Sequence, residues 1–196
     1  MVRSMDVVGT VVGFILGVGG TLTTERIGLW LKRPKIRVEF TPDEHCLRFS
    51  HAHVANGVRV FETESKFLRL RVSNESRFPA KNCRALLSDV RRYGSEQNST
   101  LLLADTLPLR WAYLGFQPID LPGRTHFYVD LISALQNDKH FKIGLEAEPL
   151  VLQNATRAEG KYSFDVSVVG DNFDPVSLRV CVNWKRDWDF EEIWTE

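Results

Sequence analysis

Side chains that bind transition metals gather in one short stretch of the sequence. Asp43-Glu-His-Cys46 and His51-Ala-His53 place two carboxylates, three imidazoles and a thiol within eleven residues. Residues two apart on a strand share a face, so the last two histidines have the spacing of a His-x-His ligand pair. A tight hairpin over residues 43–50 would bring His45 or Cys46 close to His51 and His53. This stretch is therefore either a metal site or a polar hairpin with solvated histidines, and the lack of a second ligand cluster favours the hairpin.

Catalytic and nucleotide-binding signatures are missing from the rest of the sequence. No G-x-S-x-G motif occurs, and no glycine-rich phosphate loop lies between a strand and a helix. None of the three cysteines has a catalytic sequence context; Cys83 follows an expected strand start, and Cys181 falls on the polar face of its strand. We therefore expect structural thiols, no cofactor and no enzymatic activity.

Two further groups of residues have properties that suit binding. Four basic residues share one expected strand and form either a modest anion patch or a solvated strand face, which we favour; they are Lys81, Arg84, Arg91 and Arg92. Three tryptophans near the C-terminus either cover one end of the core, which we favour, or offer a partner surface; they are Trp184, Trp188 and Trp194.

The elements that position these residues are expected to be strands, because apolar and polar residues alternate along most of the chain. We expect strands at 36–40, 58–61, 67–72, 81–93, 127–131, 141–152, 162–168 and 176–184, and a short helix near 131–138. Short strands without crossover helices indicate an all-β fold, an antiparallel immunoglobulin-like β-sandwich. Tyr162 has the position of a tyrosine corner, in which the phenol bonds back to preceding backbone.

In this region, roughly residues 60–195, the chain resembles a loose group of bacterial proteins with an N-terminal membrane helix and an immunoglobulin-like sandwich. The likeness rests on the stretch Phe67–Cys83 and on Ile119-Asp-Leu-Pro-Gly123. The resemblance implies no particular activity; domains of this kind usually bind or scaffold.

A membrane anchor precedes the domain. The run from Val7 to Thr24 has eighteen residues without an ionisable side chain, and as a helix it would span roughly 27 Å, close to the hydrocarbon thickness of a bilayer. We expect an anchor over residues 1–34, with a transmembrane helix at about 7–31, and a soluble domain over 35–196. A cleaved signal peptide and a buried soluble helix are the less favoured alternatives, because there is no Ala-x-Ala site and five glycines would weaken a soluble helix.

Charges at the two ends of the span predict its orientation. One arginine precedes the span, whereas four basic residues follow it closely: Arg26, Lys32, Arg33 and Lys35. The excess places the C-terminal domain in the cytoplasm, at the inner membrane, and three unpaired cysteines suit a reducing compartment. Beyond Lys35 there are 20 basic and 23 acidic residues, a balance that does not favour nucleic acid as a partner.

Three glycines give the anchor one small-residue face. Gly9, Gly13 and Gly17 recur at every fourth position, a spacing that suits close packing between transmembrane helices. The alternative is that lipid simply tolerates them. We expect a homo-oligomer formed through this face.

Taken together, these features predict a single-pass, non-enzymatic membrane protein whose sandwich binds or scaffolds an unknown protein or small molecule. The alternative is a membrane-disrupting or pore-forming effector of a bacterial defence system, with the sandwich sensing a ligand such as a nucleotide. A hydrolase with a site built from loops is the least favoured interpretation.

Overall fold

The computed structural model describes residues 32–41, 46–55, 58–94, 99–136, 138–185, 190 and 192–196, with backbone alone for 46–63. Residues 34–196 form one compact unit. Every strand pairing is antiparallel, and the described residues contain one short helix, α3 (Leu150–Ala155). The expected all-β class is confirmed. The expected membrane segment lies outside the described residues; within them, no helix is long and apolar enough to cross a bilayer.

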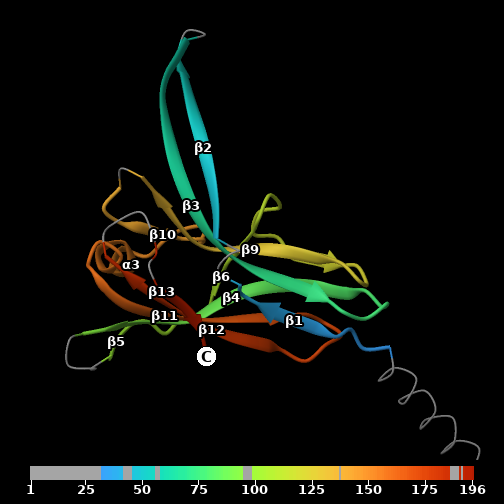
Figure 1. Cartoon of the computed structure of the whole chain (residues 1–196). Coiled ribbons are helices and arrows are strands. Elements are labelled where there is room, and N and C mark those ends of the chain that lie inside the picture. The colour runs from blue at the N-terminus through green and yellow to red at the C-terminus, as the bar shows by residue number, and fades with distance from the viewer. Residues whose placement is uncertain are drawn as a thin grey trace, which may run out of the picture. The chain divides into compact units, whose positions relative to one another are not determined.

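The first sheet is built around β3 (Val58–Asn74), its longest strand (Figure 1). Along one edge of β3, β1 (Ile36–Glu39) pairs with the C-terminal part and β2 (Cys46–Ala55) with the N-terminal part. Along the other edge lies β9 (His126–Leu135), which also pairs with β10 (Phe141–Ile143) and β7 (Arg110–Trp111). The β2–β3 hairpin extends well beyond the rest of the sheet.

The second sheet has the order β13 (Glu192–Thr195), β12 (Val176–Trp184), β11 (Gly160–Val169), β4 (Ala80–Tyr93), β5 (Ser99–Leu103). Two short strands, β6 (Leu107–Pro108) and β8 (Ile119–Leu121), also pair with β4. The β11–β12 ladder is continuous over nine residue pairs. Its central strands therefore form a rigid platform.

One apolar core joins the two sheets, as in a sandwich. It forms because alternate residues of each strand are apolar: Leu68, Leu70 and Val72 of β3 are buried, as are Phe164 and Val166 of β11. Aromatic rings fill the end of the core near β10. There Phe141 makes edge contacts with Tyr162, Phe164 and Trp184 at centroid distances of 5.1, 6.2 and 5.4 Å.

The tyrosine corner is confirmed. The hydroxyl of Tyr162 donates towards the carbonyl oxygens of Ala155, at 2.7 Å, and Ala158, at 2.6 Å. Both carbonyls belong to the C-terminal end of α3 and the turn that follows it. These two bonds tie the C-terminal end of α3, the only helix among the described residues, to the start of strand β11.

Two expected elements were wrong. The segment 131–138 was expected to be helical, but β9 continues to Leu135. A bulge opposite Leu68 and Arg69 leaves Leu131 unpaired, so both Leu131 and Ile132 are buried, and the apolar run lost its period of two. The expected strand 141–152 ends at Ile143, because Gly144 packs against the backbone of Asp130 and Pro149 begins α3.

Candidate functional site

The β2 strand does not form the hairpin expected over residues 43–50. It runs straight from Cys46, which pairs with Leu68, to Ala55, which pairs with Val58. Cys46 and His51 are therefore five residues apart on one strand, roughly 16 Å at ~3.3 Å per residue, too far apart to share an ion. His45 and the side chains of Cys46, His51 and His53 lie outside the described residues. Among the residues that are described, no group of three or more His, Cys, Asp or Glu is placed to hold a metal.

The four basic residues of β4 do not form one patch. Lys81 and Arg84 lie near the start of the strand, and Arg91 and Arg92 lie at its end. Lys81 pairs with Asp120 at 2.6 Å, and Arg91 with Asp89 at 3.0 Å. Arg84 and Arg91 are seven residues apart on the strand, roughly 23 Å at ~3.3 Å per residue, so the two groups cannot share an anion.

The predicted tryptophans have different positions. Trp184 is fully buried beside Phe141 and Phe190, so it belongs to the core and is not available to a partner. Trp194 is half-buried on β13. Trp188 and the glycines Gly9, Gly13 and Gly17 lie outside the described residues.

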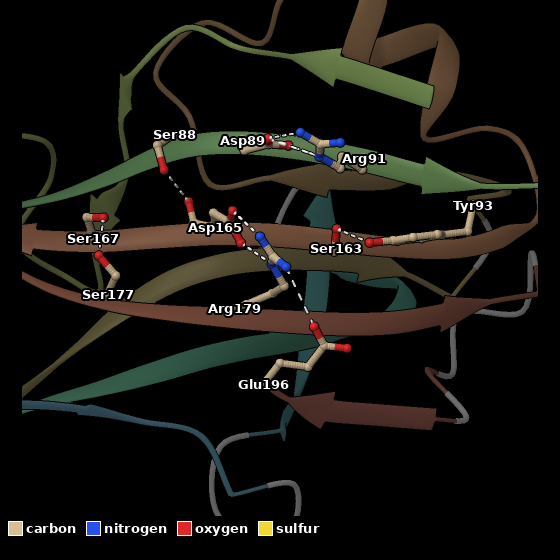
Figure 2. Close-up of polar contacts among 10 residues, drawn as sticks. All are labelled: Ser88, Asp89, Arg91, Tyr93, Ser163, Asp165, Ser167, Ser177, Arg179 and Glu196. Atoms are coloured by element: carbon tan, nitrogen blue, oxygen red, sulfur yellow. Dashed lines mark hydrogen bonds and ion pairs between the residues drawn. The ribbon is translucent and has the colours of Figure 1, made fainter. Parts of the chain in front are cut away.

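The most organised polar surface is the outer face of the sheet formed by β4, β11, β12 and β13 (Figure 2). Asp165 of β11 accepts two bonds from Arg179 of β12, at 2.5 and 2.8 Å, and Glu196 lies 3.7 Å from the same guanidinium. Further along, Ser167 and Ser177 bond at 2.7 Å. The hydrogen bond to Asp165, and then the charge of that carboxylate, raise the pKa of Arg179 above its ordinary value. These contacts hold β11, β12 and the C-terminal residue together in the middle of the face.

At one end of this face the sheet is hollowed into a pocket of about 620 Å³. Tyr93 of β4 lines one side and Trp194 of β13 the other, with β11 and β12 between them. Lys161 reaches across the pocket, and its Nζ lies 5.6 Å from the centre of the Trp194 ring. Cys181 lies on the floor, at 3% exposure, and pairs with Ser163 and Trp194 on the neighbouring strands. The arrangement offers ring surfaces, one amine and a small-residue floor; Glu196, whose carboxylate lies 3.7 Å from Arg179, also lines the pocket.

Sequence reasoning placed Cys181 on the polar face of β12, which is confirmed, but did not find the pocket. Tyr93, Lys161 and Asn183 were not recognised as site residues. They come from three strands and lie side by side because Lys161 pairs with both Tyr93 and Asn183. No local spacing signals such a meeting.

The thiols of Cys83 and Cys181 are buried and free. Burial raises the pKa of each to about 11. Both therefore stay neutral at physiological pH and are poor nucleophiles.

We predict that a Cys46→Ser variant resists iodoacetamide at pH 8. A pKa of about 11 leaves Cys83 and Cys181 with thiolate populations about two orders of magnitude below that of an ordinary cysteine. Mass spectrometry should find both thiols unmodified in the native protein and both modified in urea. Rapid native labelling of Cys181 would contradict the burial described above.

A second polar cluster is buried on the outer side of the first sheet. Asp130 of β9 accepts a bond from Arg69 Nε at 2.6 Å and two from Arg110, at 3.0 and 2.7 Å. The Arg69 guanidinium lies between the rings of Phe67 and Tyr113, at 5.1 and 4.9 Å from their centres. Side-chain exposure is 5% for Arg69 and 4% for Asp130. The cluster fastens the turn that carries Tyr113 to the sheet, which is a structural role.

Compared with protein-family models and with curated proteins, the chain matches none. The class of molecule is therefore defined by its own fold and surface: an all-β domain of two antiparallel sheets with a pocket on one outer face.

Proposed function

We propose that this chain is a membrane-anchored, non-enzymatic binding or scaffolding protein whose soluble part is an immunoglobulin-like domain. The observation that carries the proposal is the pocket between Tyr93 and Trp194. Its walls stand on strands that a continuous ladder and the Asp165–Arg179 pair hold in place. Sites of this size with aromatic walls and few polar groups are typical of ligand binding.

Strand order supports the immunoglobulin-like assignment. The first sheet has the order β1-β3-β9-β10, and the facing sheet contains β4-β11-β12. In chain order, β1-β3-β9 and β4-β11-β12 correspond to strands A-B-E and C-F-G of constant-type immunoglobulin domains. The short strand β7, which precedes β9 and pairs with it, has the place of strand D, whereas β10 follows β9 and has no counterpart. The tyrosine corner falls at the start of β11, the strand that would be F.

The anchor is supported by the uncharged run from Val7 to Thr24 and by the basic residues after it. In this proposal the anchor holds the domain on the cytoplasmic side of the inner membrane, and Gly9, Gly13 and Gly17 assemble it with other copies. Cys83 and Cys181, buried and unpaired, suit that compartment.

A second candidate, a membrane-disrupting effector, shares these parts. In this candidate the pocket is the sensor, and ligand binding leads the glycine-striped helices to rearrange as the copies assemble. The two candidates differ in what assembly does to the membrane.

Expression of the full chain in bacteria tests both. We expect the protein to stay in the membrane pellet after alkaline carbonate washing, while the cells remain impermeable to propidium iodide. Release by carbonate would refute the anchor. Leakage that Gly13→Leu abolishes and that the matched control Gly19→Leu, about 120° away from Gly13 around the expected helix, does not abolish would replace scaffolding with the effector.

A further inference from the structure

The pocket exists because small residues occupy the centre of a face whose rim carries large ones. Gly160 at the start of β11 has no side chain, and its φ of +146° lies in a region that favours glycine. Cys181 lines the floor at 3% exposure, and its pairing partner on β11, Ser163, is also small and 3% exposed. A flat polar sheet face would have long side chains at these positions, so the hollow is a built feature of this surface.

Among the described residues that line the pocket, Lys161 is the one with a basic side chain. Arg91 pairs with Asp89, and Arg179 pairs with Asp165. Among the described residues, in contrast, no carboxylate lies within ion-pair distance of Lys161, whose recorded neighbour is the face of Trp194. An anion bound beside Lys161 would therefore gain an ion pair without breaking an existing one, while the carboxylate of Glu196, which also lines the pocket, is held near Arg179.

The aromatic rings that line the pocket indicate that the uncharged part of the ligand is also a flat ring. Trp194 is half-buried against the pocket, and Tyr93 forms the opposite wall, with its hydroxyl 3.4 Å from Ser163 Oγ. Indole and phenol faces attract flat rings through offset stacking. Asn183 at the side of the pocket has an amide nitrogen 3.3 Å from Glu192 Oε2, and its carbonyl oxygen offers an acceptor for a ring N–H.

We infer that the pocket binds a planar aromatic anion, with its ring stacked on Trp194 and its charged group paired with Lys161 Nζ. The inference rests on the proposed binding role of the domain and names the ligand class. A volume of about 620 Å³ accommodates a ligand with one or two fused rings and an attached charged group. Two sources share this chemistry: a nucleotide and an aryl carboxylate.

Titration calorimetry on the full chain in lipid nanodiscs tests the inference, with empty nanodiscs as the blank. Each probe is paired with an uncharged analogue: AMP with adenosine, and 2-naphthoate with 2-naphthamide. We expect at least one anion to bind with a dissociation constant below about 1 mM and about tenfold tighter than its analogue. Whichever pair shows that difference identifies the source.

Two variants locate the binding. Lys161→Met should reduce the anion's affinity about tenfold, to that of the uncharged analogue, and leave the analogue's own affinity unchanged. Trp194→Ala should weaken both about tenfold, whereas Trp194→Phe, which keeps a ring, should lose less. Lys142→Met, which removes an exposed lysine from β10 in the other sheet, is the matched control and should change neither.

The inference is overturned if neither anion binds more tightly than its analogue, or if Lys161→Met leaves the difference intact. Lys161 is exposed, so its variant is expected to fold, and the result does not depend on Trp194→Ala. Failure here leaves membrane retention untouched, whereas release of the chain by carbonate would refute the anchor without bearing on the pocket.

Discussion

Replacing Asp130 by alanine is expected to lower the free energy of unfolding by about 3–5 kcal/mol, because it removes the buried carboxylate that pairs with a buried cation. Asp130 is the shared acceptor of Arg69 and Arg110. Arg110 is 44% exposed at its side chain and can turn to water, but Arg69 is 5% exposed and cannot. The variant removes the buried carboxylate that pairs with Arg69, while the 3.1 Å bond from Arg69 Nη1 to the Tyr113 hydroxyl remains.

Urea unfolding of the detergent-solubilised full chain, followed by tryptophan fluorescence, measures this loss. Trp111, buried next to Arg110 on β7, reports on the region. Arg110→Ala is the matched control and should cost only about 1 kcal/mol, because it removes a half-exposed partner and leaves the Arg69–Asp130 bond.

A double variant separates a stranded charge from lost packing. Arg69→Met with Asp130→Leu removes both buried charges, and replacing a buried pair by apolar residues is often nearly neutral. We expect the double variant to be more stable than Asp130→Ala alone. If it were less stable, the cluster would owe its value to the geometry of its hydrogen bonds and not to charge compensation.

The alternating strands could be predicted from the sequence, and the places where the prediction failed have physical causes. Val176–Trp184 was predicted with its observed bounds, because one face is apolar and the other polar throughout. In β9 the bulge at Leu131 buries two consecutive apolar residues, and such a run cannot be told from a helical segment by period alone. The short helix at 150–155 was missed because six residues with one buried leucine carry no helical period.

The pocket could not be predicted, because it depends on register between distant strands. Tyr93 meets Lys161 only through the pairing of β4 with β11, sixty-eight residues later in the chain, and Trp194 joins through β13. Hydrophobic alternation determines which face a residue occupies but not which residue of another strand lies beside it. The tyrosine corner could be found, because its partners, Ala155 and Ala158, are within seven residues of Tyr162.

Sequence patterns also suggested groupings that the register separates. Lys81 and Arg92 occur on one strand, yet each is bonded to a different part of the domain, Asp120 in one case and the carbonyl of Glu159 in the other. Along an extended strand each residue adds about 3.3 Å, so residues several positions apart on one strand are far apart in space. For this reason, a cluster of polar residues on one strand of a β protein indicates a binding site only when strand pairing brings its members together.

The second large effect is expected at Phe141, which lies at the centre of the aromatic core. Its ring contacts those of Tyr162, Phe164 and Trp184 edge-on, and it is completely buried. Phe141→Ala would leave a cavity bordered by three rings that the backbone ladders of β11 and β12 prevent from closing in. Large-to-small substitutions of this kind cost about 3–5 kcal/mol.

The same urea titration measures this loss in a series of variants that remove different amounts of buried volume. Phe141→Leu should cost less than Phe141→Ala, because it removes less volume, while Leu150→Ala, at a position 75% exposed on α3, should change stability by no more than about 0.5 kcal/mol. Since Tyr162 borders both this cluster and the pocket, Phe141→Ala should also weaken binding of the aromatic anion. If Phe141→Ala changed stability as little as Leu150→Ala does, the two sheets would not share the core described here.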